Sequence, residues 1–175
     1  RGLGDVYKRQ GTFEPITNIV GGGVHQLKAG EWTADISMAL CLAQSLIDCK
    51  GFDAKDQMLK YCKWYDEGYM SSTGTCFDIG NTTRKALDDF AITDNPYSGE
   101  KDIRSCGNGS IMRLAPIPMY YCKEPEVALK YAALSSKTTH AHSLCLDACR
   151  YMAGIIIGLL NGESKETVLS YMYSP

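Results

Sequence analysis

A hydroxyl and a carboxylate stand at the start of a strongly apolar stretch, in the segment Gly30-Glu-Trp-Thr-Ala-Asp-Ile-Ser-Met38. Thr33 and Asp35 supply hard oxygen atoms, which are the ligands that a magnesium-like ion prefers. Both residue types also satisfy the free amides at the start of a helix as N-caps. On chemistry alone the cap is the more common use, so the pair is a candidate metal site with a structural alternative.

A second carboxylate lies in Cys76-Phe-Asp-Ile-Gly-Asn-Thr-Thr83, where Asp78 precedes a glycine and an Asn-Thr-Thr helix start. An aspartate there can act as a general base if a substrate and its water lie within hydrogen-bond reach. Asp, Asn and Thr also form turns and caps through local side-chain hydrogen bonds. The residues alone leave both uses open for Asp78.

A glycine-flanked turn is expected to open a helix in the segment Gly107-Asn-Gly-Ser-Ile-Met-Arg113. Backbone amides at the positive end of a helix bind phosphate oxygens, and Arg113 can add charge or a planar fork. The candidate phosphate-binding residues are Gly107, Asn108, Gly109, Ser110 and Arg113. The alternative is a tight turn followed by a surface arginine, either solvated or in a salt bridge.

The last chemical candidate is His140 in Thr138-Thr-His-Ala-His142, which can donate a hydrogen bond to a sugar hydroxyl. A single loop histidine is more often structural or merely exposed. No role is assigned to His25.

Helices are expected to position these residues, because apolar side chains recur with helical spacing almost throughout the chain. The periodicity predicts a core helix over 37–48, with Met38, Cys41, Leu42, Ser45 and Leu46 on one face. Further helices are expected at about 55–69, where Met58, Leu59, Cys62, Trp64 and Tyr65 supply apolar surface, and at 81–90, 126–134, 144–160 and from Lys165. Pro116 and Pro118 should break or kink the apolar run 110–121. Convincing alternating strands are missing, so the chain is expected to be all-α.

Composition fits one globular domain: of 175 residues 45% are hydrophobic and 22% charged, with a net charge of -2. No basic stripe favours nucleic acid, and no apolar run approaches the ~20 residues of a membrane span. The eight cysteines show no CxxC or clustered zinc spacing and no signal peptide precedes them. We expect reduced thiols that act mostly as buried small hydrophobes in a cytoplasmic protein.

Both ends of the chain are abrupt. Residues 1–10, RGLGDVYKRQ, are basic and aperiodic and look like a translated sequencing-adapter scar, so they are expected to lie outside the native fold. The helical pattern from Lys165 stops at Pro175 without a polar tail or glycine cap. The domain is therefore expected to comprise 11–175 and to be partial.

In this order, the four motifs resemble the ADP-ribosylglycohydrolase family, which includes the bacterial enzymes that remove ADP-ribose from dinitrogenase reductase. The resemblance covers about residues 11 to 173, through segments 30–40, 77–83, 107–116 and 135–140. It implies an all-α fold with two magnesium ions at a cleft where water attacks the anomeric carbon that links ADP-ribose to a protein side chain or another acceptor. Such ions can orient ribose hydroxyls and water while a carboxylate accepts the proton.

Site roles follow from the resemblance residue by residue. Thr33 and Asp35 match metal ligands, and Asp78 matches the acidic residue at the substrate ribose. The loop of Gly107, Asn108, Gly109 and Ser110, with Arg113, matches the diphosphate and ribose loop, and His140 matches the substrate-side histidine. The implied catalytic carboxylates are Asp78 and Asp35, and the implied partner is an ADP-ribosylated protein or an ADP-ribose-containing small molecule.

The chain departs from the family pattern in three places. Ala34 stands where the family has a metal-binding aspartate, and Ile36 replaces a threonine. The family's upstream Gly-Asp-Ala-Leu-Gly segment and its C-terminal Asp-x-Asp-Thr motif are absent from the sequence. The resemblance therefore implies that this polypeptide alone cannot complete the metal site.

Three functions stay open on this basis. The parent protein is expected to be a magnesium-dependent hydrolase of which this chain is an impaired part. Ala34 and Ile36 beside an intact glycine loop favour, as the alternative, a non-catalytic ADP-ribose-binding module. A purely structural helical interaction module would explain the apolar periodicity but not the ordered motifs.

Overall fold

The computed structural model describes residues 17–171 and 173–175. The chain divides into two compact units, Arg1–Glu31 and Trp32–Pro175. The described part of the first unit contains a tight turn, in which Gly22 and Leu27 exchange backbone hydrogen bonds of 2.7 and 3.0 Å. The expected scar at residues 1–10 lies outside the described residues. The candidate chemistry lies in the second unit, described below.

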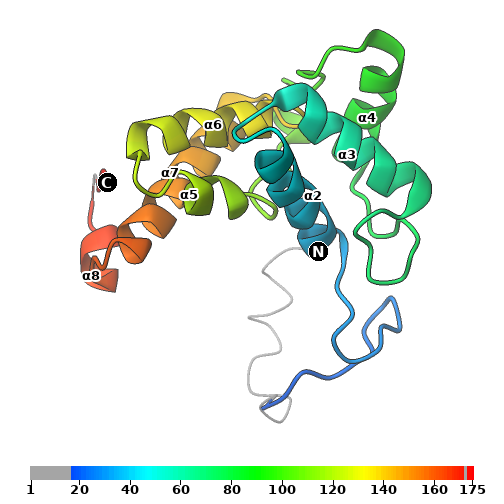
Figure 1. The fold of residues 1–175 in the computed structure, drawn as a ribbon, viewed down its shortest axis with the longest axis horizontal. Coiled ribbons are helices and arrows are strands. Elements are labelled where there is room, and N and C mark those ends of the chain that lie inside the picture. Colours follow the sequence, from blue (N-terminus) through cyan, green and yellow to red (C-terminus); the bar gives the residue numbers. More distant parts are fainter. Residues whose placement is uncertain (1–16, 172) are drawn as a thin grey trace. The chain divides into compact units, whose positions relative to one another are not determined.

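The second unit is built from helices (Figure 1). They are α2 (Ala34–Asp48), α3 (Ala54–Glu67), α4 (Asn81–Thr93), the short 3-10 helix η1 (Ile103–Ser105), α5 (Pro116–Tyr120), α6 (Pro125–Lys137), α7 (Ser143–Leu160) and α8 (Lys165–Val168). Within the described residues the only β contacts are two isolated bridges, Gly22 with Leu27 and Glu100 with His140. The all-α prediction is confirmed.

Helix α2 forms the centre of the core, as its spacing predicted. Met38, Cys41, Leu42, Ser45 and Leu46 are all buried. Helix α3 packs beside it and buries Met58, Tyr61 and Trp64. The expectation for Leu59 was wrong: its side chain is 51% exposed, because the buried face of α3 runs through 57, 58, 61 and 64.

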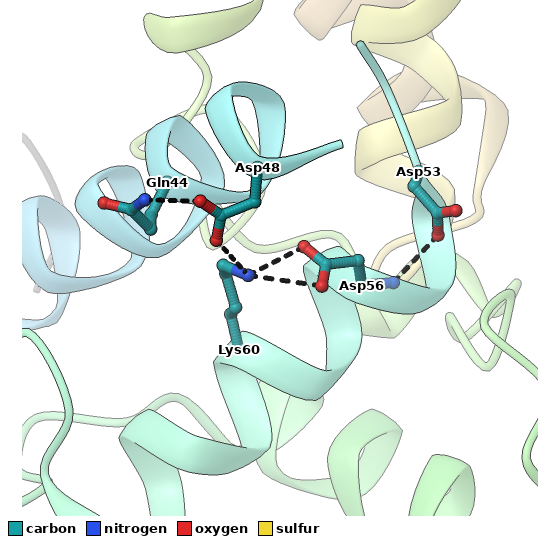
Figure 2. Close-up of polar contacts among 5 residues, drawn as sticks. All are labelled: Gln44, Asp48, Asp53, Asp56 and Lys60. Carbon is teal, nitrogen blue, oxygen red and sulfur yellow. Dashed lines mark hydrogen bonds and ion pairs between the residues drawn. The ribbon is translucent and has the colours of Figure 1, made fainter. Parts of the chain in front are cut away.

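An ion-pair cluster connects α2 to α3 (Figure 2). The Lys60 ammonium lies 2.9 Å from carboxylate oxygens of both Asp48 and Asp56, and its side chain is only 14% exposed. Gln44 donates to Asp48 at 2.7 Å, and Asp53 caps α3 by accepting from the Asp56 amide at 2.8 Å. Lys60 therefore fixes the start of α3 against the end of α2.

Helices α6 and α7 lie side by side (Figure 1), and α5 packs against both. Length and composition alone would allow α7 to cross a membrane, although core helices of folded proteins pass the same test. Only 33% of this stretch is buried in the structure. Helix α7 is 18 residues long and agrees with the helix expected at 144–160.

The eight cysteines are free thiols. Cys41, Cys145 and Cys149 are buried, as expected of small hydrophobes, whereas Cys49 and Cys106 are exposed. Burial raises the pKa of Cys41 to about 12, so this thiol stays protonated in the core.

Candidate functional site

Three of the sequence motifs meet at Gly109. A β-carbon placed on Gly109 would lie 2.7 Å from His140 Cε1 and 3.0 Å from Thr83 Oγ1. Thr83 comes from the first turn of α4, and both Thr83 and His140 are buried. The backbone of the glycine loop therefore rests directly on the histidine and on the Asn-Thr-Thr helix start, and only glycine fits there.

The loop is anchored on one side and exposed on the other. Ser110 is buried, and its hydroxyl lies 2.8 Å from the Ser136 hydroxyl and 3.6 Å from Cys149 Sγ. Gly107 and Asn108 are exposed. Within the described part of the chain, the amides of Asn108 and Gly109 donate no hydrogen bond. Neighbouring amides with this freedom can bind an anion.

The expected helix does not follow this loop. Residues 109–113 form turns, and α5 begins only at Pro116. Pro116 and Pro118 lack an amide donor and are therefore tolerated only in the first turn of a helix, which is where both stand in α5. Anion binding at 107–110 would therefore depend on the loop amides, without a helix end behind them.

Arg113 is fully buried beneath the loop. Its Nη1 donates to the Gly109 carbonyl at 2.7 Å, and its Nη2 donates to Thr139 Oγ1 at 2.8 Å. The guanidinium lies 4.7 Å from the centre of the Tyr61 ring. The alternative of a solvated or salt-bridged surface arginine was wrong, because this side chain holds the loop from its buried side.

Neighbouring hydroxyl groups bind both the ring and the backbone of His140. Thr139 Oγ1 lies 2.8 Å from Nδ1, and Ser136 donates to the His140 carbonyl at 2.9 Å. Desolvation, assisted by the positive charge of Arg113, lowers the His140 pKa to about 4. The ring is therefore neutral at neutral pH, and the alternative of an exposed loop histidine was wrong.

Asp78 is exposed and lies three residues before α4. Its φ of 59° is in the left-handed region, which Asp tolerates better than most residues. The side chain or backbone of Asp78 makes contacts within the protein. Its exposure leaves the carboxylate accessible beside the start of α4.

A polar depression lies at the start of α4, with a volume of about 460 Å³. It is lined by Asn81, Thr82, Lys85, Glu100, Asp102, Arg104 and Ser105. Thr82 directly precedes Thr83, and the Glu100 carbonyl accepts from the amide of Ala141, next to His140. The depression is therefore lined by neighbours of the contacting motifs, and not by Thr83, Gly109 or His140 themselves.

Thr33 and Asp35 form a separate pair at the start of α2. Thr33 occupies the N-cap position, but its side chain makes no capping bond and instead donates to Asp35 Oδ2 at 2.9 Å. Trp32 and Ser72 exchange hydrogen bonds that tie this start to the loop after α3. The hydrogen bonds of the described residues do not join Thr33 or Asp35 to the Gly109 contact.

A magnesium ion is only partly accommodated by the described residues. Thr33 and Asp35 supply suitable oxygens, but Ala34 is buried and Ile36 is half exposed, and neither offers a ligand. The described part of the chain contains no group of three or more His, Cys, Asp or Glu side chains able to hold a metal ion. These residues therefore fit part of a magnesium site and not a complete one.

Sequence reasoning missed three hydroxyl residues that build the site: Thr83, Ser136 and Thr139. Each neighbours or faces a motif residue. The paired threonines in Asn-Thr-Thr and Lys-Thr-Thr-His were the sequence feature that could have pointed to Thr83 and Thr139. Their contacts show that the site is a cluster of polar side chains packed against the glycine loop.

Comparison with known proteins defines the class to which this helical domain belongs. The family model described as ADP-ribosylglycohydrolase matches residues 4–174. The ADP-ribosylarginine hydrolase Tri1 of Serratia proteamaculans is 37% identical over 155 residues, which are 89% of this chain and 42% of that protein. The human ADP-ribosylhydrolase ARH3 is 32% identical over 147 residues, 82% of this chain and 39% of ARH3.

Solved structures agree with the sequence comparison. A chain of an ADP-ribosylglycohydrolase-related protein complex superposes with a TM-score of 0.77 at 40% identity, over 91% of this chain and 50% of that one. The protein belongs to the ADP-ribosylglycohydrolase family. Its chain spans less than half the length of the curated relatives cited above.

Proposed function

We propose that the whole protein hydrolyses the glycosidic bond between ADP-ribose and a protein side chain or another acceptor. The observation that carries this proposal is the contact of Thr83 and His140 with Gly109, in a loop where the amides of Asn108 and Gly109 donate no hydrogen bond within the described residues. Such a loop can take the diphosphate while the histidine donates to a sugar oxygen. Arginine is the first acceptor to test, because Tri1 is named an ADP-ribosylarginine hydrolase.

Roles for the carboxylates complete the proposal. Asp78, exposed at the start of α4, would accept a proton from the attacking water, which is the work of a general base. Thr33 and Asp35 would hold magnesium together with ligands from outside the described residues, and Asp35 would also face the water. Bound magnesium would orient ribose hydroxyls and water. Eight free cysteines support a cytoplasmic setting, where thiols stay reduced.

The first experiment measures the melting temperature of this chain with and without ADP-ribose, in magnesium and in chelator. A ligand that binds only the folded state at 100 times its Kd adds about 2.7 kcal/mol of stability. We expect ADP-ribose to raise the melting temperature. The full gene product should then release ADP-ribose from ADP-ribosylarginine in magnesium. A cooperative melt that ADP-ribose leaves unchanged, with no release by the full gene product, would refute the proposal.

A non-catalytic ADP-ribose-binding module is the second candidate, favoured by Ala34 and Ile36. Neither side chain offers an oxygen, although both lie beside the Thr33–Asp35 pair. This candidate predicts that ADP-ribose stabilises the protein equally in magnesium and in chelator. It also predicts no turnover by the full gene product, so measurable hydrolysis excludes it.

A further inference from the structure

Arg113 carries a positive charge into the core without a carboxylate partner. Its side chain is 0% exposed, and none of the ion pairs among the described residues includes it. Its shortest hydrogen bonds run to the Gly109 carbonyl and to Thr139 Oγ1, at 2.7 and 2.8 Å. Burying an arginine is costly unless its donors are used, and Nε has no hydrogen-bond partner among the described residues. The short bonds to Gly109 and Thr139 are therefore the main polar contacts that hold the side chain in place.

The Thr139 hydroxyl lies between two nitrogen atoms. Its oxygen is 2.8 Å from Arg113 Nη2 and 2.8 Å from His140 Nδ1. A guanidinium only donates hydrogen bonds, so Thr139 must accept from Arg113. Thr139 is itself fully buried, and among the described residues its one hydroxyl proton has no acceptor other than Nδ1. Nδ1 then accepts, and a neutral imidazole carries its proton on Nε2.

The protonated nitrogen faces the glycine loop. His140 Nε2 lies 3.2 Å from the position of a β-carbon on Gly109, and 3.6 Å from that position on Gly107. No side chain separates the ring from these two residues, because both lack a β-carbon. The proton on Nε2 is therefore presented at the loop, beside Gly107 and Gly109.

We propose that Arg113 is a positioning residue that acts through Thr139 to hold His140 as the Nε2–H tautomer, a neutral hydrogen-bond donor at the loop of residues 107–110. The low pKa of His140, which burial and the Arg113 charge produce, agrees with a neutral ring. A neutral donor at this place suits an oxygen acceptor such as a ribose hydroxyl or ring oxygen. That the acceptor belongs to ADP-ribose depends on the proposed function, whereas the tautomer does not.

The test is nitrogen NMR of the histidine rings in this chain at pH 7, because protonated and unprotonated ring nitrogens resonate far apart. The chain has three histidines, and loss of one ring in His140→Gln assigns the signals of His140. We expect Nε2 to carry the proton and Nδ1 to be unprotonated.

Thr139→Val removes the hydroxyl at nearly constant shape, and should shift His140 toward the Nδ1–H form or a mixture of both tautomers. Thr139→Ser restores a hydroxyl and should return the Nε2–H form. Thr138→Val is the matched control, because Thr138 Oγ1 also accepts from Arg113 Nη2, at 3.3 Å, but does not touch the ring. It should leave the His140 tautomer unchanged.

A proton on Nδ1 in the unmodified chain would overturn the proposal, and so would an unchanged Nε2–H form in Thr139→Val. If Thr139→Val does not fold, Thr139→Ala replaces it, and the unmodified chain still decides the tautomer. ADP-ribose should bind about fivefold more weakly to Thr139→Val than to Thr138→Val, the loss expected for one misdirected neutral hydrogen bond. If the tautomers behave as expected but no variant binds ADP-ribose, the proposed function fails while the Nε2–H tautomer and its dependence on Thr139 stand.

Discussion

Replacing Gly109 with alanine tests the contact on which the proposed site depends. The added β-carbon would lie 2.7 Å from His140 Cε1, 3.2 Å from His140 Nε2 and 3.0 Å from Thr83 Oγ1. Neither neighbour is a flexible surface side chain, because both are buried and His140 is bonded to Thr139. The loop must therefore move away from the ring. Overpacking of this kind costs about 1–3 kcal/mol.

That cost corresponds to a melting temperature lowered by roughly 2–12 °C in a domain of this size. The displaced loop should also weaken ADP-ribose binding about tenfold or more, because its amides and the His140 donor no longer converge. Differential scanning fluorimetry and calorimetric titration with ADP-ribose measure the two effects.

Gly154→Ala is the matched control for this substitution. Gly154 lies inside α7, where an added β-carbon would come within 3.3 Å of the ring of Pro175. This contact is tight, but Pro175 is exposed and can relieve it by a small shift, and alanine is the better helix former. Its melting temperature should be unchanged or higher, with ADP-ribose binding retained. A Gly109→Ala protein that melts and binds like the parent would refute the packing of the loop on His140.

Three further predictions concern α2 and its neighbours. Lys60→Met should lower the free energy of unfolding by about 1 kcal/mol, whereas the same change at the exposed Lys55 should cost less than about 0.5 kcal/mol; urea unfolding compares them. Hydrogen bonds from Lys60 and Gln44 lower the pKa of Asp48, and those from Ser45 and Lys60 outweigh burial to lower the pKa of Asp56. Stability from these carboxylates is therefore present above about pH 4 and lost as pH falls through their lower folded pKa values. Lys60→Met should weaken this dependence in acid unfolding without abolishing it, because Gln44 and Ser45 still donate to the two carboxylates. Ala34→Asp buries a carboxylate, so it should lower the melting temperature in chelator and regain stability in magnesium. Ile36→Asp, at an exposed position, should change the melting temperature little. Equal melting temperatures of Ala34→Asp in chelator and in magnesium would contradict a cation at this place.

Elements with strong local signals could be predicted from the sequence. The buried face of α2 follows directly from helical spacing, and α3 ends at Glu67, before the C-cap Gly68, whose left-handed φ of 70° suits glycine. Contacts between distant segments could not be predicted. Arginine is usually a surface residue, so the sequence gives no sign that Arg113 is buried. Its burial is stabilised by hydrogen bonds to the Gly109 carbonyl and to Thr139 Oγ1, which come from two segments far apart in the sequence. The same holds for Leu59, because spacing alone does not say which side of a helix the rest of the fold will cover.

The two parts of the candidate site differ in what they need. The loop, Thr83, Arg113 and His140 hold one another through contacts between protein atoms of the described residues. The Thr33–Asp35 pair is different: its carboxylate and hydroxyl bond to each other, and a cation would need ligands beyond them. Binding of ADP-ribose and metal-assisted hydrolysis should therefore separate in experiment. ADP-ribose should stabilise the chain even in chelator, and the additional stabilisation in magnesium should measure what Thr33 and Asp35 contribute. If chelator abolished binding altogether, the loop would not hold the ligand by itself, and ADP-ribose binding would depend on the cation.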